Sequence, residues 1–259
     1  MESNERKIPE MKTDNIIAVR KNKTVCRDGD ACIKVFGESF SKADVLNEAL
    51  NQARVEETGL NIPKIREVTM EDGKWVIVSD FIEGKTLAKI MEEGSENFDK
   101  YLQMFVDIQI KITTKTCPLL SRLKDKMHRK IDLTDLDEPT KYELHARLEA
   151  MPKHKKLCHG DFDPSNVIIT DGGIPYIIDW AHATQGNAAA DAARTYLCFC
   201  LSGKKDVAEK YMNMYCKSSG TERKYVDKWL PIVAASQSVK GNHDEKELLR
   251  SWIDVFDYE

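Results

Sequence analysis

Residues 157–181 read LCHGDFDPSNVIITDGGIPYIIDWA and carry three oxygen-bearing side chains in a fixed order: Asp161, Asn166 and Asp179. Two short apolar runs flank the turn residues 171–173 and predict a β-hairpin. We therefore expect Asn166, at the entrance of this hairpin, and Asp179, at its exit, to lie close together. Pro164 biases the residue before it away from helix, which predicts an extended loop after Asp161.

A carboxylate, an amide and a second carboxylate in this order suit phosphoryl transfer, in which a protein mainly positions groups and supplies charge. We expect Asp161 to orient the attacking hydroxyl group and to accept its proton, and Asn166 and Asp179 to bind Mg²⁺. Asp161 and Asn166 have the spacing of the catalytic aspartate and metal-binding asparagine of protein kinases. The alternative is an aspartate-rich surface loop beside an ordinary hairpin, and the complete ordered set argues against it.

The motifs His159-Gly160-Asp161, Asn166 and Ile178-Asp179-Trp180 resemble those of the aminoglycoside phosphotransferase and choline kinase families, within the broad phosphotransferase enzyme family. This resemblance implies an α+β, two-lobed protein-kinase-like fold. The first lobe is then a small antiparallel β-sheet with one helix, and the second is larger and mainly helical. The resemblance further implies a Mg²⁺-dependent kinase that uses ATP or GTP to phosphorylate a hydroxyl group of a small acceptor, aminoglycoside-like or choline-like.

The composition is that of a globular protein and favours neither a nucleic-acid nor a membrane partner. The 259 residues are 41% hydrophobic, which suffices for a buried core, and the net charge of −4 leaves no basic stripe for a phosphate backbone. No window approaches a membrane span and the first residues contain no apolar signal core, so we expect a cytoplasmic protein. The seven cysteines lack a disulfide framework and are expected to be reduced. No protein partner is predicted.

The first part of the chain predicts strands at 16–20, 24–27 and 31–36, followed by a helix between Ser41 and Gly59. Lys34 lies in an apolar strand that resembles the kinase V-A-I-K strand, where the lysine meets the nucleotide phosphates. The alternative for Lys34 is a half-exposed lysine that buries only its stem. Periodicity leaves Glu48 and Glu56 open as its partner, and the resemblance favours Glu48.

The glycine-rich phosphate loop of protein kinases is missing, because the first hairpin turn reads Lys-Asn-Lys at 21–23. Lys21 and Lys23 are candidates to take over its contacts with the phosphates. Strands at 65–69 and 75–79 lead into a segment that resembles the family hinge, whose backbone contacts adenine, and we assign that contact to Asp80, Phe81 and Ile82. The predicted division is a nucleotide-binding lobe at 1–82 and a catalytic, substrate-binding lobe at 83–259.

The sequence of the second lobe predicts helices, including a single helix at 222–235. Asp191 is expected to be a structural anchor of a loop. The final segment, 243–259, is acidic and would attract a cationic acceptor, although charge runs usually face water. Trp180, Trp229 and Trp252 are candidates for a cation–π cage, with burial in the core as the commoner alternative. The motifs are compatible with two functions: a small-molecule kinase and a catalytically idle nucleotide-binding scaffold. No expected catalytic part is missing, which favours the kinase.

Overall fold

The computed structural model describes residues 16–20, 22–239 and 243–253. Lys21 and three residues of the acidic segment, Asp254, Asp257 and Glu259, lie outside the described residues. The chain divides into two compact units, Met1–Lys85 with Ile168–Ala181, and Thr86–Val167 with His182–Glu259. The predicted functional boundary after residue 82 stays a prediction.

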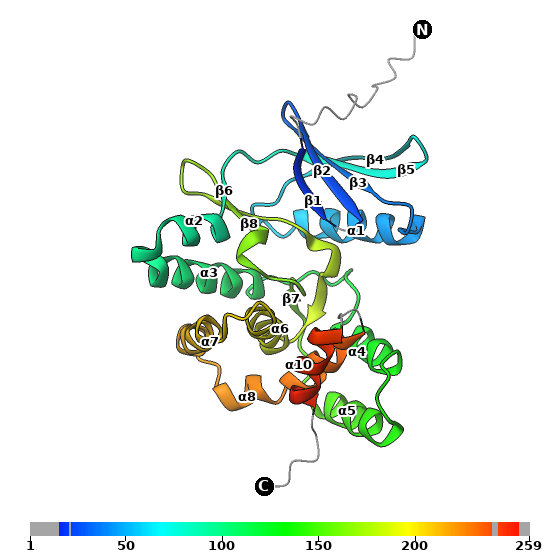
Figure 1. Cartoon of the computed structure of the whole chain (residues 1–259), viewed down its shortest axis with the longest axis vertical. Coiled ribbons are helices and arrows are strands. Elements are labelled where there is room, and N and C mark those ends of the chain that lie inside the picture. The colour runs from blue at the N-terminus through cyan, green and yellow to red at the C-terminus, as the bar shows by residue number, and fades with distance from the viewer. Residues whose placement is uncertain (1–15, 21, 240–242, 254–259) are drawn as a thin grey trace. The chain divides into compact units, whose positions relative to one another are not determined.

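The first unit is built on a five-stranded antiparallel sheet with the order β1-β2-β3-β5-β4 (Figure 1). Its strands are β1 (Ile16–Arg20), β2 (Lys23–Asp28), β3 (Ala31–Phe36), β4 (Ile65–Glu71) and β5 (Lys74–Asp80). Tight turns join β2 to β3 and β4 to β5, so neighbours in sequence are neighbours in the sheet, except where the chain leaves β3 for a helix. The sheet buries apolar side chains on both faces: Cys26, Ile33 and Val76 on one, and Phe36 and Ile77 on the other, which a helix covers.

Helix α1 (Lys42–Glu56) covers that face and closes a small core of Phe36, Val45, Ala49 and Ile77. The helix begins where the sequence predicts, because Ser41 accepts from the Asp44 N–H and Asp44 accepts from the Ser41 N–H, a complete capping box. It ends at Glu56, before the predicted stop at Gly59. The cap fixes the direction of α1, which presents Glu48 to the sheet.

The hairpin that leads to Asp179 belongs to the first unit from Ile168 onward, although the residues before it belong to the second. Strand β8 (Val167–Ile169) turns into β9 (Pro175–Ile177). Asn61 holds the returning strand: its carbonyl accepts from the Ile177 N–H at 3.0 Å, and its Nδ2 donates to the Pro175 carbonyl at 3.1 Å. This attachment delivers Asp179 to the sheet that carries Lys34.

The second unit is mainly helical, and a short pair of strands, β7 (Lys156–Cys158) and β10 (Thr184–Gly186), runs through it. The larger helices before this pair are α2 (Leu87–Glu93), α3 (Phe98–Thr113), α4 (Leu123–Asp132) and α5 (Glu138–Ala150). After it come α6 (Ala188–Leu201), α7 (Lys205–Ser219), α8 (Arg223–Asp227), α9 (Leu230–Ser238) and α10 (His243–Ile253). The core between them includes Phe105 and Phe162, whose rings stack at 4.4 Å.

The prediction of one continuous helix at 222–235 is wrong, because two helices, α8 and α9, occupy this range. Pro231 lies at the start of α9. A proline there lacks the N–H that a continuing helix needs and clashes with the carbonyl of residue 227, so the helix stops and restarts.

The fold class itself is confirmed: an antiparallel sheet in the N-terminal part and a helical C-terminal part. None of the helices in the described ranges has the length and apolar character needed to cross a membrane.

Candidate active site

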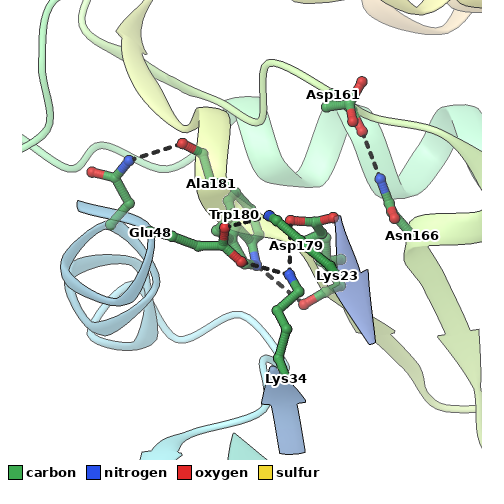
Figure 2. A network of polar contacts seen from close by, with 10 residues as sticks. Lys23, Lys34, Glu48, Asp161, Asn166, Asp179, Trp180 and Ala181 are labelled. Carbon is green, nitrogen blue, oxygen red and sulfur yellow. Dashed lines mark hydrogen bonds and ion pairs between the residues drawn. The ribbon is translucent and has the colours of Figure 1, made fainter. Parts of the chain in front are cut away.

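Lys34 of β3 lies between two carboxylates of the first unit (Figure 2). Its Nζ is 2.5 Å from Oε1 of Glu48 and 3.4 Å from Oδ1 of Asp179. Burial by itself lowers the pKa of Lys34, but the charges of Asp179 and Glu48 outweigh it, so the pKa lies above its usual value. The ammonium group therefore stays charged at neutral pH and is available as a fixed positive charge.

Glu48 is the partner of Lys34, and Glu56 is not. The second oxygen of Glu48, Oε2, accepts from Nζ of Lys23 at 2.7 Å, so one carboxylate holds two ammonium groups. Glu56 instead accepts from the Ile65 N–H at 2.8 Å and fixes the start of β4. Only 9% of the Glu48 side chain is exposed, and pairing with two cations offsets the cost of burying its charge.

Asp179 adopts a left-handed backbone conformation, with φ of 64°. Such a conformation costs an aspartate about 1–3 kcal/mol and persists where the surroundings fix it. Trp180, which is fully buried, donates from Nε1 to the Ile177 carbonyl at 3.1 Å, and Asn51 of α1 donates from Nδ2 to the Ala181 carbonyl at 3.3 Å. The backbone on both sides of Asp179 is thus anchored, and its carboxylate is aimed at Lys34.

In the second unit, Asp191 of α6 anchors the loop that carries Asp161. Its two carboxylate oxygens accept from the His159 N–H at 3.1 Å and the Gly160 N–H at 2.7 Å. Burial raises the pKa of Asp191, while His159 and these two N–H groups act in the opposite direction. These contacts agree with the structural anchor expected at this position.

The side chain of Asn166 is held in place by the backbone of Asp161. Its Nδ2 donates to the Asp161 carbonyl at 2.9 Å, and only 2% of the residue is exposed. Its Oδ1 is buried and has no hydrogen-bond partner among the residues that the structure describes. An orphaned buried amide oxygen is costly, and it suits a hard cation that binds oxygen ligands. The residues of the loop therefore fit Mg²⁺ binding.

Arg194 is a residue of the site that the sequence motifs did not predict. From α6, its guanidinium donates to Oδ1 of Asp161 at 2.9 Å and to Sγ of Cys198. Burial raises the pKa of Cys198 to about 12, although Arg194 acts in the opposite direction, so this sulfur is a neutral thiol. Arg194 lies three residues after Asp191, so both point from one face of α6 toward the loop. The three-residue spacing between Asp191 and Arg194 is the sequence signal that points to Arg194.

The backbone N–H groups of Asp80, Phe81 and Ile82, the residues predicted to contact adenine, differ in whether they are already hydrogen-bonded. The N–H of Asp80 donates to the Lys64 carbonyl at 3.0 Å and that of Phe81 to the Asp30 carbonyl at 2.9 Å. Within the described part of the chain, no hydrogen bond is found for the N–H of Ile82. Of the three, only Ile82 therefore keeps a backbone donor for a ligand.

Gly160 precedes Asp161 with φ of 78°, and a Cβ built there would lie 2.4 Å from the His182 carbonyl oxygen. Gly203 has a similar φ of 72° but open space around it. We expect Gly203→Ala to cost about 1–2 kcal/mol of unfolding free energy from backbone strain alone. Gly160→Ala should cost about 1–3 kcal/mol more, because the clash adds to the strain. Urea denaturation of both variants measures the difference, and equal losses would show that His182 moves away freely.

A lysine of an antiparallel sheet, paired with a glutamate of the helix that covers it, and an aspartate–asparagine loop in a helical unit are the arrangement expected of a kinase-like phosphotransferase. The chain belongs to the phosphotransferase enzyme family, whose model matches residues 28–226. No curated protein sequence matches it significantly.

Solved structures share the fold at low sequence identity. Aminoglycoside phosphotransferase APH(4)-Ia has a TM-score of 0.68 and 17% identity over 92% of this chain and 90% of that one. A thermostable mutant of that enzyme, in a ternary complex with AMP-PNP and hygromycin B, has a TM-score of 0.68 and 16% identity over the same shares. Choline kinase LicA from Streptococcus pneumoniae has a TM-score of 0.62 and 15% identity over 91% of each chain.

Proposed function

We propose that this protein is a small-molecule kinase that transfers the γ-phosphoryl group of ATP or GTP to a hydroxyl group of a small acceptor. The observation that carries the proposal is the orphaned Oδ1 of Asn166, five residues after the carboxylate of Asp161. A buried amide oxygen without a partner is explained by a cation that the site binds with its nucleotide. Membership of the phosphotransferase enzyme family supports the same reaction class.

Lys34 binds the nucleotide phosphates in this proposal. Its ammonium is a compact charge, and Glu48 fixes its position from α1. Positioning of this kind supplies most of the catalysis in phosphoryl transfer, because the protein makes few covalent changes itself. Ile82 donates its backbone N–H to the base of the nucleotide, next to Asp80 and Phe81.

Asp161 acts as the base. Its carboxylate accepts the proton of the acceptor hydroxyl while the hydroxyl oxygen forms a bond to the γ-phosphorus, and the bond from that phosphorus to the β–γ bridging oxygen breaks. Arg194 engages Oδ1 of Asp161, so Oδ2 is left to face the acceptor. The products are a phosphate ester and ADP or GDP.

Asn166 and Asp179 are the proposed ligands of Mg²⁺, which would neutralise charge on the phosphates when bound. Asn166 offers its amide oxygen, which has no partner among the described residues, and Asp179 offers a carboxylate on an anchored, left-handed backbone. Both are oxygen ligands, as Mg²⁺ prefers, and two protein ligands are a usual number because the ion keeps several waters.

The acceptor is proposed as a class only: a hydroxylated small molecule, with aminoglycoside-like and choline-like amines as the first to test. The ternary complex of the APH(4)-Ia mutant with AMP-PNP and hygromycin B supports both the nucleotide and the kind of acceptor. Trp180 and Trp229 are buried in the core, so the candidate cation–π cage is wrong for these two residues. In the part of the acidic segment that the structure describes, Asp244, Glu247 and Leu248 are exposed, as on a solvated helix. A cytoplasmic location stays a prediction.

The test is a screen of the purified protein with Mg·ATP and Mg·GTP against a panel of aminosugars, choline-like amines, sugars and hydroxylated amino acids. We expect acceptor-dependent release of ADP or GDP with at least one class. Binding of Mg·nucleotide without release on any acceptor would contradict the kinase and favour the idle scaffold.

A further inference from the structure

Lys23 and Lys34 project from the same face of the sheet. In the β2–β3 pairing, Val25 lies opposite Lys34 and Lys23 lies opposite Phe36. Paired residues share a face, and so do residues two apart on one strand, so the two lysines are diagonal neighbours on the face that α1 covers. Figure 2 shows both side chains pointing toward Glu48.

Lys23 is the first residue of β2, and its side chain nevertheless turns toward the interior of the unit. Its Nζ lies 4.9 Å from the Phe36 ring and 5.0 Å from the Phe40 ring, and 19% of the side chain is exposed. A lysine at a strand end can easily place its ammonium in water, and burying it has an energetic cost. The aromatic rings and Glu48 therefore hold a charge at this position.

The charge balance around Lys34 shows what a second ammonium supplies. Lys34 contacts two carboxylates, Glu48 and Asp179, so these three groups together carry a net charge of −1. Without the Mg²⁺ that Asp179 is proposed to bind, such a set repels a polyphosphate. Lys23 brings the set to neutrality and adds donors beside Lys34, in a chain whose hairpin turn lacks the glycines of a phosphate loop.

We propose that Lys23 is a second phosphate-binding residue, which donates to the phosphate oxygens of a bound nucleoside triphosphate beside Lys34. This inference rests on the proposed nucleotide-dependent function and adds the group that replaces the glycine-rich loop. Glu48 holds the ammonium of Lys23 before the nucleotide binds, which reduces the ordering cost on binding.

The competing explanation is structural: Lys23 would only neutralise Glu48 and keep α1 in place. The two explanations differ in how the effect depends on the number of phosphates. A lysine that contacts the phosphates affects the binding of ATP strongly and that of adenosine very little. A lysine that only supports the fold affects all nucleotides through the same loss of structure.

The experiment is isothermal titration calorimetry with ATP, ADP, AMP and adenosine, in the presence of Mg²⁺, on the wild type, Lys23→Met and Lys23→Arg. GTP and its relatives replace the series if the wild type prefers them. We expect Lys23→Met to weaken ATP binding about ten- to a hundredfold, as for the loss of a charged hydrogen bond, and to leave adenosine binding unchanged. Lys23→Arg should retain most of the affinity, because it keeps the charge.

Lys42→Met is the matched control. Lys42 also lies over an aromatic ring of the same unit, with Nζ 5.6 Å from the centre of Trp75, and no contact between it and Glu48 is found among the described residues. It should bind every nucleotide like the wild type, and thermal melting should show all variants folded.

Equal losses for ATP and adenosine in Lys23→Met, or no loss for either, would overturn the role of Lys23 while leaving the proposed function intact. A wild type that binds neither ATP nor GTP would overturn both, and only that outcome counts against the function. The results for Lys23→Met therefore test the role of Lys23 alone, whereas the binding of ATP and GTP to the wild type tests both claims.

Discussion

Asp161→Asn lowers kcat by about 10²–10⁴-fold, the usual contribution of a positioned acid–base group, while nucleotide affinity stays close to that of the wild type. Asparagine has the shape of aspartate and can still accept a hydrogen bond from Arg194, which contacts Oδ1 in the wild type at 2.9 Å. It cannot take up the proton of the acceptor hydroxyl. Steady-state kinetics on an acceptor found in the screen, with calorimetry of nucleotide binding, separates the two effects.

Asp163→Asn provides the control in the same loop. Asp163 accepts from the Ser165 N–H at 2.8 Å and caps a short 3₁₀ turn, a role that the asparagine oxygen can fill equally well. Activity close to that of the wild type is expected. If Asp161→Asn were also fully active, Asp161 would not be the base, and the assignment of the loop would fail.

Asp179→Asn is expected to lower kcat/KM by about 10²–10³-fold and to raise the Mg²⁺ concentration needed for half-maximal rate. The loss corresponds to several kcal/mol of charge stabilisation by a metal ion, at about 1.4 kcal/mol per factor of ten. Asparagine tolerates the left-handed backbone at φ of 64°, so the fold is kept. Removing this carboxylate also removes one of the two acidic partners of Lys34. Rates measured over a Mg²⁺ titration report both consequences.

Asp171→Asn changes a carboxylate at the turn of the same hairpin, where the residue is exposed. It should leave the Mg²⁺ titration unchanged. An Asp179→Asn variant with a wild-type Mg²⁺ requirement would show that Asp179 serves only to pair with Lys34.

Local patterns in the sequence were sufficient for most of the fold. The capping box at Ser41 and Asp44 lies within one turn, and the strand and turn signals of β2 to β5 lie within a few residues of one another. These features depend on chain geometry alone. The break at Pro231 could also have been predicted, because the rule against proline inside a helix is local.

Pairings between distant residues needed the structure. Periodicity could not choose between Glu48 and Glu56, because both lie near the apolar stripe of α1. The contact of Lys34 with Asp179 spans 145 positions and depends on Asn61, which attaches the hairpin to the first unit. Arg194 was missed because its partner lies 33 residues away, on a loop that Asp191 and Thr195 attach to α6.

The most direct test is the phosphorus NMR spectrum of a reaction of Mg·ATP or Mg·GTP with an acceptor from the screen, recorded with the wild type and with Asp161→Asn. The account predicts a new phosphate ester signal and matching ADP or GDP with the wild type, and almost none with the variant in the same time. A nucleotide that stays intact with every acceptor, or an ester signal that grows equally fast with both proteins, would contradict it.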